Sequence, residues 1–271
     1  MALTLSGCTF GWLHRAPLPD AIRALARQGF STLELTTAPP HLFARNLGPY
    51  ERRELARLLR EHGLEAVSVN PSFADINLIS TNPEIRAVSE RQLRAELELA
   101  ADLGARYAVL IPGRRHALAP APDESARAVL DQALGRLLPR AEKLGVTICL
   151  ENSPYGYLGT AADLVGIVER WKSRHLRITY DVANALGVED PAEGVRTVGG
   201  HLALAHVSDS WRGRWAHTSA GRGEVDFGGF ARALQEVGFQ GPTVYELVDG
   251  EDPEPRLPGD LATLAAAGWS R

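Results

Sequence analysis

The chain has 271 residues, of which 45% are hydrophobic and 23% are charged, and its formal net charge is −4. This composition is typical of a soluble globular protein with a sizeable core, and it lacks the basic excess that favours binding to nucleic acid or an anionic membrane. No apolar segment of the sequence reaches the length of about 18 residues that a transmembrane helix requires.

Strand-like and helix-like patterns alternate along the chain. Eight apolar runs have the length and bounding residues of buried strands: Thr4–Gly11, Ser31–Thr37, Leu64–Pro71, Tyr107–Pro112, Val146–Asn152, Leu176–Asp181, Leu202–Val207 and Pro242–Leu247. Helical patterns lie between them, for example Asn82–Leu103 and Asp123–Leu144, each followed by a glycine that predicts a left-handed cap. This alternation predicts an α/β fold, a (β/α)8 TIM barrel that forms a single domain over residues 1–271.

The cysteines and the N-terminal segment indicate a cytoplasmic protein, and the positions of the lysines exclude a Schiff-base mechanism. Cys8 and Cys149 both lie in predicted strands, which is typical of reduced core residues in a cytoplasmic protein. The N-terminal sequence MALTLSGCTFG lacks the basic segment of a signal peptide. The only lysines, Lys143 and Lys172, lie in predicted helices, so no lysine at a strand end is available for a Schiff base.

Four polar side chains stand at the ends of the last four predicted strands. They are Glu151, Asp181, His206 and Glu246. The C-terminal ends of the strands form the active-site face of a parallel barrel, and unpaired charges in buried strands are costly. We therefore expect the four to converge on one divalent metal. Three carboxylates and one imidazole suit Mn²⁺, Mg²⁺ or Co²⁺, with Zn²⁺ as a further candidate. The alternative for any single member is a capping residue or a hydrogen-bond partner of a ligand.

The motifs around these residues resemble those of the xylose isomerase-like barrel superfamily. The matching stretches are LEN, YDVAN, AHVSDS, YEL and the G-x-G-x-V-D-F run from Gly221 to Phe227. The superfamily includes sugar isomerases, ketose 3-epimerases, hydroxypyruvate isomerase, inosose dehydratase and endonuclease IV. The resemblance implies that the same four side chains bind the metal. It also implies that Glu151 and Glu246 flank the reacting carbons as an acid/base pair.

Two such carboxylates suit proton transfer next to a carbonyl group. On opposite faces of a planar enediolate, one can remove a proton and the other return it, which is epimerisation. The same pair can shift a proton between neighbouring carbons, which is aldose–ketose isomerisation. The expected substrate is a small sugar, a sugar phosphate or a hydroxy-keto acid, and the sequence leaves these open.

Candidate substrate-binding residues lie in the segments that follow the predicted strands. The longest predicted loop, Ser208–Val225, contains His217 and Arg214, and an arginine there could hold a phosphate or carboxylate. The other candidates are Asn184, Trp12, His14, Asn70 and His116. Each could instead be a packing or surface residue. Glu34, in the LEL of the second predicted strand, could face the barrel and form hydrogen bonds near the site, although a structural role is expected.

Three alternative functions remain open at this point. A lyase like inosose dehydratase would use the same metal and base to expel a hydroxyl group. An apurinic endonuclease is disfavoured, because Asn184 and Trp215 stand where those enzymes carry a histidine and an aspartate. A non-catalytic sugar-binding barrel would have no reason to keep four costly polar groups. The resemblance also implies a homodimer or homotetramer, although no interface pattern is visible.

Overall fold

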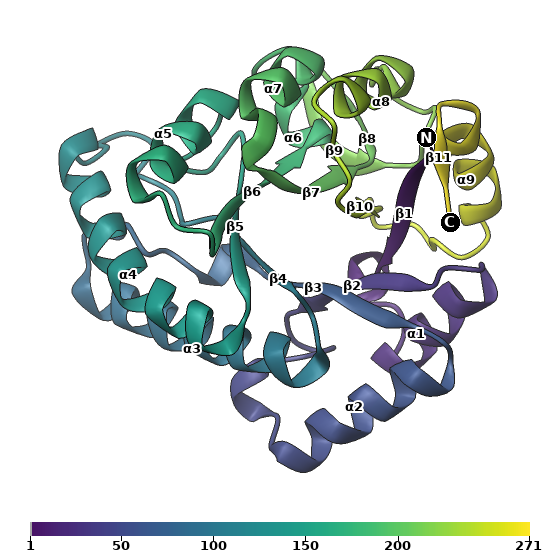
Figure 1. The fold of residues 1–271 in the computed structure, drawn as a ribbon, viewed down its shortest axis with the longest axis horizontal. Coiled ribbons are helices and arrows are strands. Elements are labelled where there is room, and N and C mark those ends of the chain that lie inside the picture. Colours follow the sequence, from purple (N-terminus) through teal and green to yellow (C-terminus); the bar gives the residue numbers. More distant parts are fainter. Residues whose placement is uncertain (1) are drawn as a thin grey trace.

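Eight parallel strands close into a barrel in the computed structural model, which describes residues 2–271 (Figure 1). Met1, the first residue of the predicted domain, lies outside the described residues. The barrel strands are β1 (Leu3–Cys8), β2 (Thr32–Thr37), β3 (Glu65–Pro71), β4 (Tyr107–Leu110), β5 (Thr147–Glu151), β6 (Leu176–Asp181), β7 (Leu202–Val207) and β10 (Thr243–Tyr245). Each strand pairs with the next, and β10 pairs with β1 to close the ring. The predicted TIM barrel is therefore confirmed.

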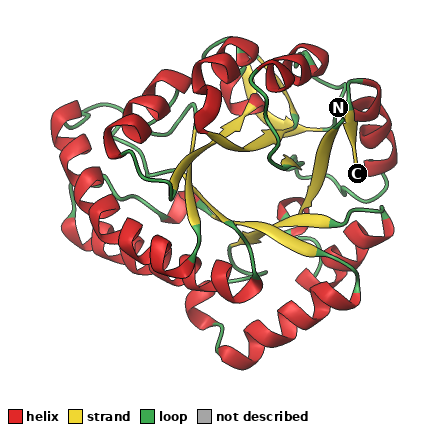
Figure 2. Cartoon of the chain, in the orientation of Figure 1, coloured by secondary structure: helices red, strands yellow, loops and turns green. Residues whose placement is uncertain are grey.

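Helices surround the barrel on its outer side (Figure 2). They are α1 (Leu18–Arg27), α2 (Pro49–Glu61), α3 (Pro83–Leu103), α4 (Asp123–Leu144), α5 (Ala161–Trp171), α7 (Pro191–Val198), α8 (Phe227–Glu236) and α9 (Leu257–Ala266), with the single-turn α6 (Val182–Ala185) directly after β6. Short 3₁₀ turns occupy Phe10–Trp12, Ala44–Asn46, Phe73–Asp75 and Gly199–His201, and β11 (Trp269–Ser270) pairs with the start of β1. None of the described helices is both long and apolar enough to cross a bilayer.

The ends of α3 and α4 follow the sequence closely. The side chain of Asn82 caps the start of α3 by accepting a hydrogen bond from the backbone N–H of Glu84. Gly104 and Gly145 end the two helices at φ angles of 74° and 70°, which are left-handed values that favour glycine. These caps turn the chain into β4 and β5 within three residues.

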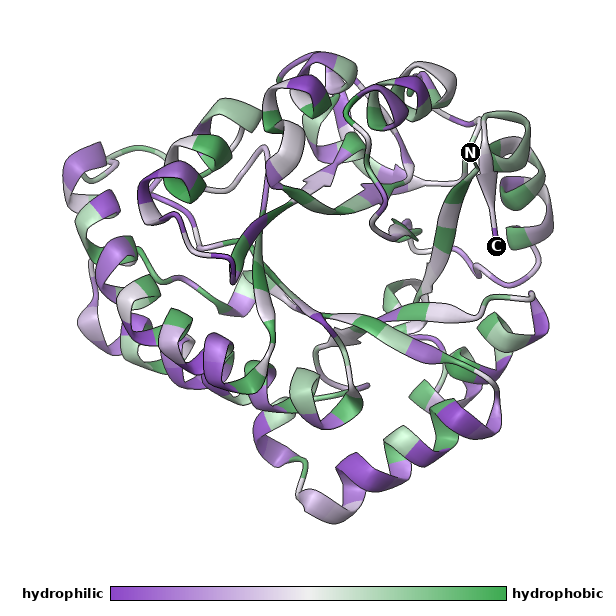
Figure 3. Ribbon diagram, in the orientation of Figure 1, coloured by the Kyte–Doolittle hydropathy of each residue, from purple (hydrophilic) through white to green (hydrophobic). Residues whose placement is uncertain are grey.

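The core lies between the barrel and the helices, and a smaller apolar cluster fills the barrel itself. Apolar segments of the helices face the strands, while polar segments face outward (Figure 3). Inside the barrel, Cys8, Val109, Cys149, Leu204 and Val244 are buried against one another. Both cysteines are free, as expected for core residues. The interior layers therefore form a solid floor beneath the C-terminal end of the barrel.

A buried carboxyl group, that of Glu96, lies on a helix outside the barrel. Glu96 of α3 is fully buried near Thr37, the last residue of β2, and no hydrogen bond within the described structure reaches either carboxylate oxygen. Burial raises the pKa of Glu96 to about 8, and Thr37 and Arg52 oppose this shift only in part. The protonated form of Glu96 is therefore favoured in the folded protein.

The segment after β7 differs from the prediction. The expected loop Ser208–Val225 contains a β-hairpin, formed by β8 (Asp209–Trp211) and β9 (Arg214–Thr218). The buried carboxylate of Asp209 accepts hydrogen bonds from the backbone N–H groups of Gly221 and Gly223, both at 2.8 Å. These bonds fold the rest of the segment back onto the hairpin, which gives it a fixed shape at the mouth of the barrel.

The first and last barrel strands are shorter than predicted. β1 ends at Cys8, because the chain turns into the 3₁₀ helix Phe10–Trp12. β10 ends at Tyr245, and the chain then leaves the barrel to bond the hairpin, with the N–H of Val248 donating to the carbonyl of His217 at 2.7 Å. Glu246 therefore stands one residue beyond its strand, between the barrel and the hairpin.

Candidate metal centre and active site

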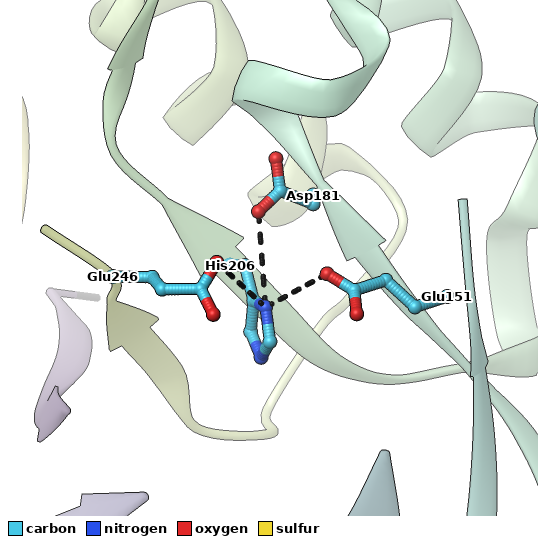
Figure 4. A group of neighbouring side chains, drawn as sticks. All are labelled: Glu151, Asp181, His206 and Glu246. Carbon is cyan, nitrogen blue, oxygen red and sulfur yellow. Dashed lines mark hydrogen bonds and ion pairs between the residues drawn. The ribbon is translucent and has the colours of Figure 1, made fainter. Parts of the chain in front are cut away.

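Four buried side chains converge at the C-terminal end of the barrel (Figure 4). The ligand atoms of Glu151, Asp181, His206 and Glu246 all lie within 4.8 Å of one another. Glu151 and Asp181 are the last residues of β5 and β6, and the parallel register places Asp181 beside His206 of β7. The structure thus brings together the four residues that the sequence predicted as metal ligands.

Backbone hydrogen bonds hold Asp181 in place and leave one of its oxygens available. The side chain of Asn152 bonds both the N–H and the carbonyl of Asp181, at 2.8 and 3.0 Å. Asp181 Oδ1 caps α6 by accepting from the N–H of Asn184 at 2.6 Å. Asp181 Oδ2 is buried, has no hydrogen-bond partner in the described structure, and lies 3.7 Å from His206 Nδ1. A buried carboxylate oxygen without a donor is a natural ligand for a cation.

His206 presents one ring nitrogen to the three carboxylates. Its Nδ1 lies 3.0 Å from Glu151 Oε1 and 3.6 Å from Glu246 Oε2. On the other side of the ring, Nε2 lies 3.2 Å from Glu34 Oε2, to which it can donate its proton. A proton fixed on Nε2 leaves the lone pair of Nδ1 for a cation.

Glu34 is the site residue that the sequence analysis undervalued. It is fully buried and also accepts hydrogen bonds from Ser68 Oγ at 2.7 Å and Asn70 Nδ2 at 2.9 Å. Asn70 Nδ2 in turn reaches Glu246 Oε1 at 3.2 Å. The available signal was a carboxylate in the middle of an apolar strand, where a charge requires partners.

The charges in the cluster shift one another's pKa values. Burial raises the pKa of Glu151 to about 7 and also raises that of Asp181, although the neighbouring histidines counteract it. Burial alone would raise the pKa of Glu246, but His206 and His217 hold it well below its usual value. Burial alone would lower the pKa of His206, but Glu34, Glu151 and Glu246 raise it well above its usual value. A cluster that binds a proton this tightly suits a divalent cation, which would compete with that proton.

The hairpin brings His217 to the edge of the cluster. Its Nδ1 lies 3.2 Å from Glu246 Oε2 and 3.1 Å from Ser208 Oγ. Burial alone would lower the pKa of His217, but the carboxylates of Asp181 and Glu246 raise it to about 9. Its side chain is 11% exposed, so it is not a solvent-facing loop histidine.

Asn184 connects the hairpin to the cluster. Its Oδ1 accepts a hydrogen bond from Trp215 Nε1 at 2.7 Å and lies 3.3 Å from His217 Nε2. Its Nδ2 donates to the carbonyl of Asn152 at 2.9 Å and lies 3.4 Å from Glu151 Oε1. Asn184 therefore holds Trp215 and His217 in a fixed position relative to Glu151.

A cavity of about 370 Å³ opens above the cluster. Among the predicted substrate-binding residues, Asn70, Asn184 and His217 line it, together with Glu151 and Glu246. A larger hollow, of about 700 Å³, lies at the opposite end of the barrel, around glycines that precede β5, β7 and β10. Of these two cavities, the smaller one is lined by carboxylates of the cluster.

The other predicted substrate-binding residues do not line this cavity. Trp12 is buried in the hydrophobic core, and His14 is exposed. His116 is also exposed and accepts backbone hydrogen bonds within its own loop. The guanidinium group of Arg214 lies 3.7 Å from the centre of the Trp211 ring on the outer part of the hairpin. No contact described here links these four side chains to the cluster.

Comparisons with known proteins agree with this architecture. The model of the family described as xylose isomerase-like TIM barrel matches residues 22–269. An uncharacterized protein of Methanocaldococcus jannaschii is 28% identical over 233 residues, which cover 83% of this chain and 77% of that protein. A ketose 3-epimerase of Arthrobacter globiformis is 26% identical over 234 residues, or 83% and 76% of the two chains. The crystal structure of a D-tagatose 3-epimerase-like protein superimposes with a TM-score of 0.83 at 23% identity, covering 97% of this chain and 99% of the other.

Proposed function

The chain belongs to the xylose isomerase-like TIM barrel family, and we propose that it is a divalent-metal-dependent sugar epimerase or isomerase. The observation that carries the proposal is the convergence of three carboxylates and one imidazole beside a cavity that two of the carboxylates line. The similarity to a ketose 3-epimerase over most of both chains supports a ketose as the substrate and epimerisation as the reaction.

The four clustered residues fit a divalent cation. Glu151, Asp181, His206 and Glu246 would hold it, and Asp181 Oδ2 supports this assignment because it is buried and accepts no hydrogen bond from the described residues. The donor set, three carboxylate oxygens and one imidazole nitrogen, suits Mn²⁺, Mg²⁺, Co²⁺ or Zn²⁺. When bound, the cation would act as a Lewis acid that stabilises negative charge on the carbonyl oxygen of the substrate.

Glu151 and Glu246 would carry out the proton transfer. Both line the cavity, and they approach His206 Nδ1 from β5 and from the end of β10. One carboxylate removes the proton from the carbon beside the carbonyl, and the electron pair of that C–H bond forms an enediolate. The other carboxylate returns a proton to the opposite face of the same carbon, which inverts its configuration.

The surrounding residues hold this pair in place. Asn70 donates to Glu246 Oε1, and Asn184 lies within 3.4 Å of Glu151 Oε1, so each carboxylate has an amide neighbour that also lines the cavity. Glu34 orients the ring of His206 from behind. Such fixed contacts reduce the rearrangement that the reaction requires.

Product analysis tests the proposal. The metal-loaded protein is incubated with a panel of ketoses, hydroxypyruvate and inososes, and the products are identified by NMR. The proposal expects an epimeric or isomeric sugar, formed by the wild type and not by Glu246→Gln. Loss of water from an inosose would instead identify a lyase, and no conversion of any compound would contradict an enzyme of this class. The oligomeric state, a homodimer or homotetramer, and the cytoplasmic location of the protein remain predictions.

A further inference from the structure

The cavity above the cluster has two chemically different ends. At the floor lie the hydrogen-bonding side chains Glu151, Glu246, Asn70, Asn184 and His217. The remaining lining is apolar except for the hydroxyl groups of Thr36 and Ser72, and most of it comes from loops after several different strands. It includes Phe10, Phe73, Ile111, Trp215, Ala216 and Val248. A ligand held at the floor would therefore extend its far end into an apolar environment.

An aromatic cluster forms the outer part of this wall. The ring of Trp215 meets the rings of Phe73 and Tyr155 edge to face, with centroids 6.5 and 5.2 Å apart. The hydrogen bond from Trp215 Nε1 to Asn184 Oδ1 fixes the indole ring against the floor. Because its only polar atom is already bonded, Trp215 offers a ligand an apolar surface.

The lining contains no arginine or lysine among the described residues. Its one basic side chain, His217, faces Glu246 and Asp181. The arginines of the hairpin are directed elsewhere, since Arg214 stacks on Trp211 and Arg212 reaches the carbonyl of Leu186. A phosphate or carboxylate at the far end of the ligand would meet no guanidinium or ammonium group there.

We propose that the substrate is an uncharged ketose whose end remote from the reacting carbons is apolar, as in a terminally deoxygenated ketose. The inference rests on the proposed function and adds the substrate class. A volume of about 370 Å³ is at the small end of ligand cavities, which suits a monosaccharide. A terminal hydroxyl group buried against this wall would lose its hydrogen bonds to water, and a terminal phosphate would lose more. Trp215 is then a specificity-determining residue.

Relative kcat/KM values test this inference with three matched substrates, namely a ketohexose, its 6-deoxy analogue and its 6-phosphate. We expect the deoxy sugar to exceed the parent sugar by about tenfold, and the phosphate to be the poorest of the three. Trp215→Ala should remove most of the preference for the deoxy sugar. The control is Trp211→Phe, because Trp211 lies on the same hairpin and does not line the cavity.

A gain of function provides the opposite test. Ala74 lines the cavity and is exposed, so Ala74→Lys can add a cation at the wall without disturbing the core. This variant should raise kcat/KM for the 6-phosphate by about tenfold while lowering the preference for the deoxy sugar. If the wild type prefers the phosphate, or if Trp215→Ala leaves the preference unchanged, the inference fails while the proposed function stands. If no ketose reacts, the proposed function fails first and this inference fails with it.

Discussion

Replacing Glu34 with glutamine should weaken metal binding although Glu34 is not among the four predicted ligands. The carboxylate of Glu34 accepts hydrogen bonds from Ser68, Asn70 and Nε2 of His206, and a longer one of 3.9 Å from Cys8 Sγ. A glutamine side chain has one oxygen, so at least one of these donors must face an NH₂ group. If that donor is His206, its proton moves to Nδ1, and the nitrogen that faces the carboxylates can no longer bind a cation.

The size of this effect follows from the role of Glu34. Loss of a hydrogen bond that orients a metal-binding histidine typically lowers metal affinity by about 10–100-fold. That range corresponds to about 1.4–2.7 kcal/mol of binding free energy. The fold should persist, because the glutamine occupies the same volume as the glutamate and leaves no cavity.

Calorimetric titration of the metal-free protein with Mn²⁺ measures the effect. The matched control is Glu65→Gln, because Glu65 is an exposed carboxylate at the start of the neighbouring strand β3. Circular dichroism establishes that both variants are folded. Wild-type Mn²⁺ affinity in a folded Glu34→Gln variant would refute the reasoning.

Three further predictions follow from the same structure. Glu151→Gln and Glu246→Gln should each lower turnover by at least about 10²-fold in a steady-state assay, and near-normal turnover in either would move the proton transfer elsewhere. His217→Ala should lower kcat/KM and change Mn²⁺ affinity little, since His217 contacts Glu246 from the hairpin; equal losses in both quantities would make it a ligand. The third concerns Glu96, whose pKa rises from 4.5 to about 8 on folding, so the folded state retains a proton that the unfolded chain releases. Its stabilising contribution is full below about pH 4.5 and is lost as the pH rises through about 8, by at most about 1.4 kcal/mol per pH unit. Thermal unfolding between pH 5 and 9 should show a smaller decline in Tm for Glu96→Gln, and parallel curves would contradict this.

The barrel and the convergence of the four polar side chains could be predicted because both depend on local patterns. Buried parallel strands are apolar throughout, so Asp181 and His206 stood out at the strand ends. Helix ends such as Gly104 were equally visible, since a left-handed cap favours glycine.

Long-range contacts explain what the sequence analysis missed. Glu34 matters because His206, 172 residues away, bonds its carboxylate, and no pattern near Glu34 reveals that partner. The two strands of the hairpin have only three and five residues, too few for a clear alternation of apolar and polar side chains. The segment is held together by Asp209, which accepts hydrogen bonds from backbone N–H groups that no sequence pattern reveals. Trp12 looked like a rim residue but is buried in the core, at the end of the 3₁₀ helix that follows β1.

Exchange with solvent deuterium tests the central claim most directly. The metal-loaded protein is incubated in D₂O with an uncharged ketose, and NMR follows deuterium at each carbon. The wild type should place deuterium at the carbon beside the carbonyl, while Asp181→Asn, which removes one carboxylate from the cluster, should bind no stoichiometric metal and catalyse no exchange. Undiminished exchange in a folded Asp181→Asn variant, or after metal removal from the wild type, would contradict metal-dependent proton transfer at this cluster.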